Sequence, residues 1–310
     1  MIDKFIRDIV NLLLYGGAFI GLCAACITAL TFELTGDVES QFPYTLLIGV
    51  CTSALYSAHR VIGLHKLKHI TSFERYTVIR RYKHHIWMYC FMWIAASIWL
   101  MLPFFPLPPE KGGFVLPFFP LPPDATAQQP GGFEFLLWLI PGVSVAALYV
   151  LPVLPKRRRL RDLGWTKIIL IGWSWAWLTA FLPAYFFDHE PLWVSVFLGV
   201  ERMLFIIAIT IPFDIRDVYI DKSVSLNTMP LLFGMKKTLM TGYILCFVIM
   251  ILAIAMSFYF HDAAYGISMS IISLTTIWFL NISSKITDDY FFSGVTDGLM
   301  ILALIIYWMI

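Results

Sequence analysis

Three aspartates lie close together near position 217, and their spacing is that of a possible cation site. Asp214, Asp217 and Asp221 stand at offsets of 0, 3 and 7, so on a helix they are rotated by only about 60° or less from one another. Three carboxylates on one stripe repel one another unless a cation neutralises them, and Mg²⁺ bridges a few carboxylates to substrate phosphates. The alternative is a solvated helix end with ordinary acidic residues, and the spacing alone does not separate the two.

A second polar group, formed by Tyr56, His59 and Arg60, lies near the end of another apolar run. An arginine within such a run is costly to bury in a membrane and usually faces the protein interior. Arg60 could hold a diphosphate directly with its bidentate guanidinium. It could equally be a counter-ion for Asp217 or Asp221 in a sealed, inactive cavity. Both hypotheses remain open.

The composition is that of an integral membrane protein. Of the 310 residues, 59% are hydrophobic and 14% are charged, whereas globular proteins have roughly 45–50% and about 25%. A spanning helix needs about 20 mostly apolar residues. The sequence therefore predicts an all-α membrane protein, with one transmembrane domain over 1–310 and nine spans. These are predicted at 9–32, 44–63, 86–105, 133–154, 168–187, 192–213, 238–260, 263–283 and 290–310.

Basic residues predict the orientation of the spans. Most Lys and Arg residues gather at 64–85, 155–167 and 214–237, and such residues concentrate in cytoplasmic loops. The loops on the other side then hold a single one, Lys111, within 106–132. We therefore expect a multi-pass protein of the bacterial inner (cytoplasmic) membrane, with a cytoplasmic N-terminus and an external C-terminus.

The predicted external loop 106–132 belongs to a duplicated proline-rich stretch. Leu102–Pro109 recurs letter for letter as Leu116–Pro123. Proline at this density favours an extended, polyproline-like backbone. We interpret the repeat as a duplicated spacer; a membrane-surface hairpin or a ligand for a proline-binding partner is the alternative.

Charged residues also occur inside the predicted spans. Glu201 and Arg202 lie within 192–213, and Asp297 lies within 290–310. Neighbours on a helix face different sides, so Glu201 and Arg202 are each expected to find their own interior partner. For Asp297 a hydrogen-bonded structural role is favoured over a role in a binding pocket.

The stretch that begins at Asp214 resembles the second aspartate motif of the UbiA superfamily of intramembrane prenyltransferases. The motif is Asp-x-x-Asp-x-x-x-Asp, followed by Thr, Pro and Gly at 7, 9 and 13 residues after the last Asp. It is matched by Asp214, Asp217, Asp221, Thr228, Pro230 and Gly234. The resemblance implies nine helices around a central cavity that opens toward the cytoplasm, with 64–85 and 214–237 as cap loops.

The resemblance also implies a function, namely transfer of a prenyl group from a prenyl diphosphate to an aromatic or lipophilic acceptor. Asp214, Asp217 and Asp221 would hold Mg²⁺, and Asp217 and Asp221 would be catalytic. Substrate-binding roles would fall to Tyr56, His59, Arg60, Lys156, Arg157 and Lys222. The expected partners are the lipid bilayer, the prenyl diphosphate and the acceptor. No nucleic-acid partner is expected, and the oligomeric state is left open.

The sequence departs from the family pattern at the end of the second span. The family's first motif, Asn-x-x-x-Asp-x-x-x-Asp, belongs there, but Ser53–His65 contains no acidic residue. Half of the expected metal-binding carboxylates are therefore missing. The alternative function is accordingly non-catalytic: a UbiA-like membrane protein that binds an isoprenoid or lipid, or a scaffold.

Overall fold

The chain is helical throughout the part that the computed structural model describes. This part comprises residues 2–36, 42–63, 74–101, 132–151, 164–223, 226–286 and 288–310, and every regular element in it is a helix. The predicted all-α class is confirmed. Residues 106–131 of the proline-rich loop and the basic residues 156–161 lie outside the described residues.

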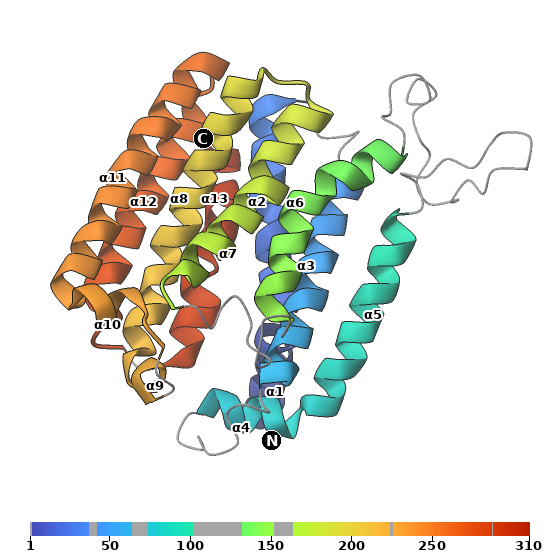
Figure 1. Cartoon of the computed structure of the whole chain (residues 1–310), viewed down its shortest axis with the longest axis vertical. Coiled ribbons are helices and arrows are strands. Elements are labelled where there is room, and N and C mark those ends of the chain that lie inside the picture. Colours follow the sequence, from blue (N-terminus) through green and yellow to red (C-terminus); the bar gives the residue numbers. More distant parts are fainter. Residues whose placement is uncertain are drawn as a thin grey trace, which may run out of the picture.

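Long helices run between the two ends of the molecule (Figure 1). The unbroken ones are α2 (Ala18–Thr35), α3 (Phe42–Gly63), α5 (Lys83–Met101), α6 (Gly132–Val150), α8 (Leu192–Arg216), α11 (Met235–Phe260) and α12 (Ala263–Ser283). Two others contain π-helical turns: α7 (Thr166–Ala176) continues as η7 (Trp177–Phe181) and η8 (Pro183–Phe187), and η9 (Phe291–Thr296) precedes α13 (Leu299–Met309). The shorter helices are α1 (Ile2–Tyr15), α4 (Glu74–Arg81), α9 (Val218–Ser223) and α10 (Met229–Phe233).

Seven helical segments in the described ranges are long and apolar enough to cross a membrane. They are α2, α3, α8, α11, α12 and the interrupted helices Thr166–Phe187 and Phe291–Met309. Helices α5 and α6 occupy the positions of the other two predicted spans, and the total of nine remains a prediction. Large apolar side chains point outward, for example Phe258, which is 76% exposed. An outer surface of this kind suits contact with lipid.

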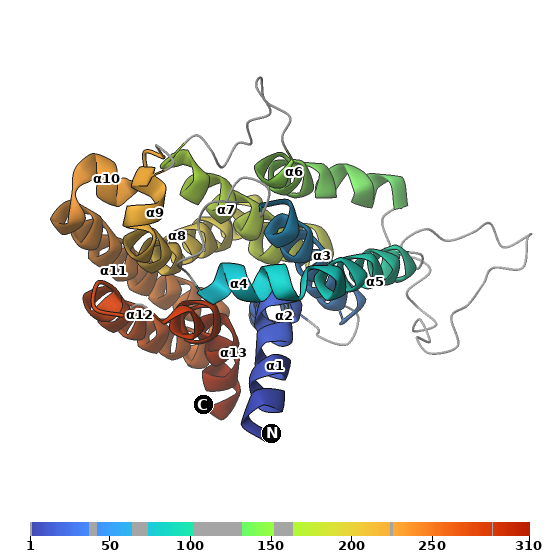
Figure 2. The ribbon, with the colours of Figure 1, turned by 90° about the horizontal axis from the view of Figure 1, so that it is seen from below.

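The long helices form a closed ring. Helix α2 packs on α3 and α13, α13 on α12, α12 on α11 and α8, α8 on α7, α7 on α6, and α6 on α3, while α5 packs on α3 (Figure 2). Small residues allow the closest approach: a Cβ on Gly21 of α2 would lie 2.5 Å from the carbonyl oxygen of Gly49 in α3. The ring therefore packs together helices that are far apart in sequence, so that their ends lie at the same end of the bundle.

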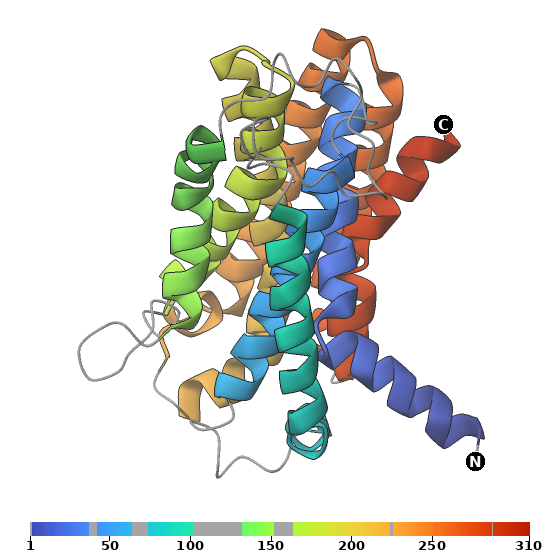
Figure 3. The ribbon, with the colours of Figure 1, turned by 90° about the vertical axis from the view of Figure 1, so that its right-hand side faces the viewer.

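The predicted span 9–32 is divided in the structure. Helix α1 ends at Tyr15 and α2 begins at Ala18. Between them Gly17 has φ 86°, in the left-handed region that favours glycine. A Cβ on Gly17 would also lie 2.6 Å from the Ser53 carbonyl oxygen. The chain therefore turns here, and α1 leaves the bundle at an angle to the long helices (Figure 3).

A buried arginine connects three helical segments in the middle of the bundle. Arg202 of α8 is 1% exposed. Its Nη1 donates to the carbonyl oxygens of Ile27 (2.6 Å) and Thr179 (3.3 Å) and to the Thr179 hydroxyl (3.2 Å), and its Nη2 donates to the Thr31 hydroxyl (3.2 Å). Ile27 and Thr31 belong to α2, and Thr179 belongs to η7. The predicted interior partners of Arg202 are therefore backbone and hydroxyl oxygens.

The neighbouring Glu201 is also fully buried and faces another helix. It accepts a hydrogen bond from the hydroxyl of Tyr265 in α12. Glu201 and Arg202 therefore face different sides of α8, as expected for neighbours on a helix, which are about 100° apart, and Tyr265 interacts with both. Together they tie α8 to α2, η7 and α12.

The ends of the bundle are distinct. Helices α1, α4, α9 and α10 lie at one end, and the C-terminus lies toward the other (Figures 1 and 3). The described residues 74–85 of the first predicted cap loop and the helices α9 and α10 of the second therefore lie at the same end of the bundle. Which side faces the cytoplasm remains a prediction.

Cysteines placed at the two ends of α11 test the orientation. In a cysteine-free background, Lys236→Cys should react with a membrane-impermeant maleimide only from the cytoplasmic side and His261→Cys only from the outside. Both positions are exposed, and basic residues mark the cytoplasmic end. Labelling of intact cells and inverted vesicles gives the measurement. The reverse pattern would invert the topology, and labelling of both from one side would contradict α11 as a span.

Candidate functional site

A lysine stands between two of the three predicted aspartates. The Lys167 Nζ lies 2.6 Å from Oδ1 of Asp214 and 3.6 Å from Oδ2 of Asp221. Lys167 is in the first turn of α7, Asp214 in the last turn of α8, and Asp221 in α9. The two carboxylates are two helical turns apart and so share one side, as the spacing predicts. One ammonium group therefore counterbalances a pair of largely buried acids.

The third aspartate, Asp217, is held by its own neighbour. It follows the last residue of α8, where the regular helix is interrupted. Arg216 forms two bonds to it, from Nε to Oδ1 (2.8 Å) and from Nη2 to Oδ2 (3.0 Å), and Arg216 Nη1 lies 3.1 Å from Oδ1 of Asp289. The guanidinium carbon also lies 5.2 Å and 4.8 Å from the ring centres of Phe213 and Phe292. The carboxylate of Asp217 is thus engaged by a fixed cation beside the Lys167 pair.

The three aspartates do not form a ready-made three-ligand metal site. Among the described residues, no three His, Cys, Asp or Glu side chains are arranged to hold a metal ion. The pair Asp214 and Asp221 still fits Mg²⁺, because this ion keeps several waters and needs only one or two carboxylates when substrate phosphates complete its shell. Oδ2 of Asp214 is buried without a hydrogen-bond partner, and the ammonium of Lys167 already takes the position of a cation.

Aromatic and imidazole rings connect the end of α3 to this cluster. The ring of His59 lies 6.4 Å from that of Tyr56 and 6.0 Å from that of Tyr149 in α6. The side chain of Trp175 in α7 interacts with that of Tyr56, and Lys167 interacts electrostatically with Tyr149. The structure therefore brings two of the predicted substrate-binding residues, Tyr56 and His59, toward the aspartates.

Arg60 has a different environment from that of its neighbours. One of its Nη atoms donates to the carbonyl oxygen of Leu14, near the C-terminal end of α1, and its guanidinium carbon lies 5.5 Å from the ring centre of Tyr15. A cation is favourable at a helix C-terminus. Arg60 also acts electrostatically on Asp297, as does Arg216. These contacts give Arg60 a structural role with the Leu14 carbonyl, the Tyr15 ring and Asp297. The expected pairing of Arg60 with Asp217 or Asp221 stays a prediction.

The remaining motif residues are placed as follows. Lys222 is exposed in the last turn of α9, and Thr228 is buried as the residue before α10. Gly234 has φ 81° at the start of α11, which explains why the motif carries glycine there. The predicted substrate-binding residues Lys156 and Arg157 lie outside the described residues.

Sequence reasoning did not find the partners of the aspartates. Lys167 was counted only as a basic loop residue, and Arg216 only as a determinant of topology. The feature of the sequence that could have identified them is their position, because both are basic residues within one turn of the end of an apolar helix. In the structure their side chains are only 12% and 10% exposed.

Comparisons with known proteins identify the architecture. No protein-family model matches the sequence, and no curated protein matches it. Several solved structures are similar over nearly their whole length, among them the following three. The apo UbiA homologue from Aeropyrum pernix K1 has 13% identity, covers 95% of this chain and 96% of its own, and gives a TM-score of 0.60. The Archaeoglobus fulgidus UbiA homologue bound to GPP and Mg²⁺ has 13% identity and a TM-score of 0.56, and the match covers 97% of this chain and 98% of the homologue. A digeranylgeranylglyceryl phosphate synthase has 12% identity and a TM-score of 0.54, and the match covers 98% of this chain and 98% of the synthase.

The chain has the UbiA fold. At 12–13% identity the likeness is one of architecture, and it extends the resemblance first seen over the aspartate motif to the whole chain. In this UbiA-type fold, the Asp214–Lys167–Asp221 cluster lies where α7, α8 and α9 meet.

Removal of Lys167 should destabilise the protein. In Lys167→Met, two largely buried carboxylates lose the cation between them, which is expected to lower the free energy of unfolding by about 3–5 kcal/mol. Adding Asp214→Asn should restore part of this loss, because it removes one of the unpaired charges. Denaturant unfolding in detergent gives the measurement. The control is Lys222→Met on exposed α9, with an expected change within about 0.5 kcal/mol. Equal stability of Lys167→Met and the wild type would contradict this account.

Proposed function

We propose that this protein is a divergent member of the UbiA superfamily and transfers a prenyl group from a prenyl diphosphate to an aromatic or lipophilic acceptor. The observation that supports this function is the Asp214–Lys167–Asp221 cluster at one end of a UbiA-type bundle. The Archaeoglobus fulgidus homologue binds GPP or DMAPP together with Mg²⁺. The same ligand class suits a cluster of carboxylates and basic side chains at the end of an apolar bundle.

The charged cluster would hold the diphosphate end of the substrate. Asp214 and Asp221 would hold Mg²⁺, which when bound lowers the barrier to loss of the diphosphate by neutralising its charge. Lys167 would then exchange its two carboxylate partners for phosphate oxygens. Arg216 keeps Asp217 in place through two hydrogen bonds. The role of these residues is to orient the diphosphate and to stabilise the negative charge that grows on it.

The transfer itself breaks one bond and forms another. The bond between the first prenyl carbon and the diphosphate oxygen breaks, and its electron pair leaves with the diphosphate. The electron-rich acceptor atom supplies a pair to the resulting allylic cation and then loses its proton. Tyr149 interacts with Lys167, and Tyr56 interacts with both Tyr149 and Trp175, so these rings could shield the cation with their faces. The lipid-embedded bundle limits the access of water, which would otherwise capture the cation.

The non-catalytic alternative has its own supporting observation. The end of α3 contains no acidic residue, so one half of the family's carboxylate set is missing. Lys167 and Arg216 already bind the aspartates that remain. A protein of this kind would bind an isoprenoid or lipid without breaking its diphosphate bond, or would serve as a scaffold.

The proposal includes the orientation in the membrane. The end with α1, α4, α9 and α10 would face the cytoplasm of a bacterial cell, with the C-terminus outside. A prenyl diphosphate would then bind with its charged group at the cytoplasmic surface and its chain in the bundle.

Substitution of Asp221 tests the function directly. Asp221→Asn removes a carboxylate that would hold Mg²⁺, and we expect Mg²⁺-dependent release of diphosphate from a prenyl diphosphate to fall by about 10²–10³-fold, the usual range for loss of one electrostatic stabiliser. Glu134→Gln, an exposed change on α6, is the control. Two quantities are measured on the purified protein: the rate of diphosphate release and the binding of the prenyl diphosphate. Wild-type protein that binds the ligand but releases no diphosphate would select the isoprenoid-binding alternative, and absence of binding would refute the transferase and favour the scaffold.

Substitution of Arg60 separates its two hypothetical roles. In Arg60→Ala the Leu14 carbonyl loses a charged donor, so we expect the free energy of unfolding to fall by about 1.5–3 kcal/mol with little change in the Kd for a prenyl diphosphate. Both quantities should be measured on the same preparation, with Arg60→Lys as the comparison. A Kd raised about tenfold at unchanged stability would instead make Arg60 a diphosphate ligand.

A further inference from the structure

Helix α1 presents an apolar stripe that the described bundle covers only in part. Ile6, Ile9, Val10 and Leu13 stand at offsets of 0, 3, 4 and 7, and 36–53% of each side chain is exposed. Helix α1 leads within two residues into α2, which is long and apolar enough to span the membrane, and it leans away from the bundle at that end (Figure 3). An amphipathic helix so close to a span lies in the membrane interface, with its apolar side toward the acyl chains.

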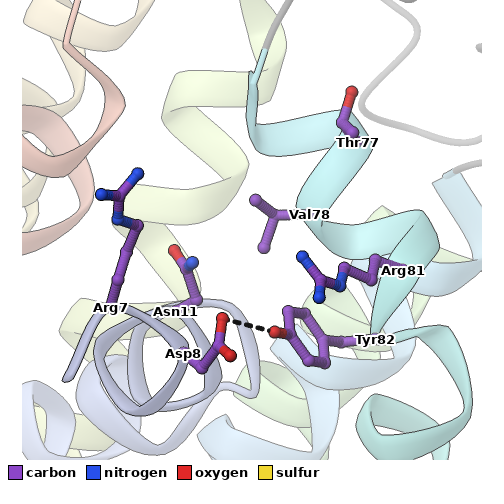
Figure 4. A pocket seen from close by; sticks show the side chains of 7 residues that line it. All are labelled: Arg7, Asp8, Asn11, Thr77, Val78, Arg81 and Tyr82. Atoms are coloured by element: carbon purple, nitrogen blue, oxygen red, sulfur yellow. Dashed lines mark hydrogen bonds between the residues drawn. The ribbon is translucent and has the colours of Figure 1, made fainter. Parts of the chain in front are cut away.

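A cavity of about 450 Å³ opens between α1 and α4. It is lined by Arg7, Asp8 and Asn11 from α1 and by Thr77, Val78, Arg81 and Tyr82 from α4 and the residue after it. Figure 4 shows the side chains of Arg7 and Arg81 coming from opposite sides, with Asn11 and Val78 between them. The volume is within the range of small-molecule sites.

The charges that line the cavity favour an anion. The lining contains two arginines and one acid, Asp8. The Tyr82 hydroxyl donates to Oδ1 of Asp8 at 2.6 Å. This hydrogen bond raises the pKa of Tyr82, so the phenol remains a neutral donor. The guanidinium of Arg81 also lies over the ring of Tyr82, at 5.5 Å. The α4 side is therefore anchored to α1, and Arg7 and Arg81 offer their donors to a ligand.

Asn11, another polar residue that lines the cavity, is fixed in place. Asn11 is 4% exposed, and its Oδ1 accepts from the hydroxyl of Tyr290 at 2.7 Å. The side-chain amide nitrogen of Asn11 can only donate hydrogen bonds. The cavity thus presents two guanidinium groups, an amide and the hydroxyl of Thr77, a set of groups that matches the oxygens of a phosphate.

We propose that Arg7 and Arg81 form a phosphate site at the membrane surface that binds the headgroup of an anionic glycerophospholipid. The polar side of an interfacial helix lies at the level of the phosphates when its apolar side faces the acyl chains. Guanidinium groups bind phosphate oxygens in pairs. A lipid is the source of phosphate that can also cover the apolar stripe of α1. The site consists of residues outside the Asp214–Lys167–Asp221 cluster and does not depend on the proposed function.

Lipid retention by the purified full-length protein tests the site. Native mass spectrometry should show one retained phosphatidylglycerol in preference to phosphatidylcholine. In Arg7→Ala/Arg81→Ala the affinity for phosphatidylglycerol should fall about 30-fold, because each basic residue near an anionic leaflet contributes a factor of about five. The matched control is Lys236→Ala/Lys237→Ala, which removes two exposed charges at the same end of the molecule and should retain the lipid.

Three results would overturn the proposal. These are no preference of the wild type for phosphatidylglycerol, an equal loss in the lysine control, and binding of inorganic phosphate or diphosphate at Arg7 and Arg81 without binding of the lipid. The last result would assign the site to a free anion. If the alanine variant unfolds, Arg7→Lys/Arg81→Lys replaces it, and the expected result is then a partial loss of affinity, since lysine keeps the charge but loses the paired hydrogen bonds.

Discussion

The guanidinium of Arg202 must find its hydrogen-bond partners inside a bundle surrounded by lipid, and the arrangement of the central helices follows from this constraint. A charged side chain at the centre of a bilayer costs at least about 2.5–3.5 kcal/mol unless it is compensated. Here four acceptors from α2 and η7 surround it. The Thr179 carbonyl accepts from both Arg202 and Thr31. The residue four positions after it, which would donate to it in a regular helix, is Pro183, which has no backbone N–H. The proline in the Thr166–Phe187 segment therefore leaves an acceptor for the charge on α8.

This internal contact also sets the depth of the candidate site. Arg202 and Asp214 lie on the same helix, α8, and their separation of 12 residues corresponds to about 18 Å along its axis. The partners of Arg202 on η7 fix the height of α7 beside α8, since α7 and η7 form one continuous segment. Lys167, at the start of α7, is thereby brought level with Asp214. A hydrogen-bonded arginine in the middle of the bundle thus aligns an ion pair at its end.

Much of this could be predicted from the sequence, because membrane insertion imposes simple rules. The apolar runs predicted the long helices, and the spacing of Asp214 and Asp221 predicted a shared side, which their common contact with Lys167 shows. The division of the first span depends on a positive φ at Gly17, and a glycine in an apolar run does not by itself predict a break. The position of Asp217 depends on the end of α8, and helix ends are poorly predicted from periodicity. The partner of Asp214 and Asp221, Lys167, is far away in sequence, so only the folded structure identifies it.

The balance of charge at the end of α8 bears on how a diphosphate could be bound there. Asp214, Asp217, Asp221 and Asp289 bring four negative charges when ionised, and Lys167 and Arg216 bring two positive ones, which leaves a net charge of minus two. One divalent cation neutralises this remainder, whereas a second would leave the cluster positive before any substrate arrived. The absence of acids at the end of α3 agrees with this count, because a second cation would need ligands that Ser53–Gly63 does not contain. If the protein does transfer prenyl groups, basic side chains such as Lys167 must then stabilise part of the diphosphate charge that a second metal ion would otherwise neutralise.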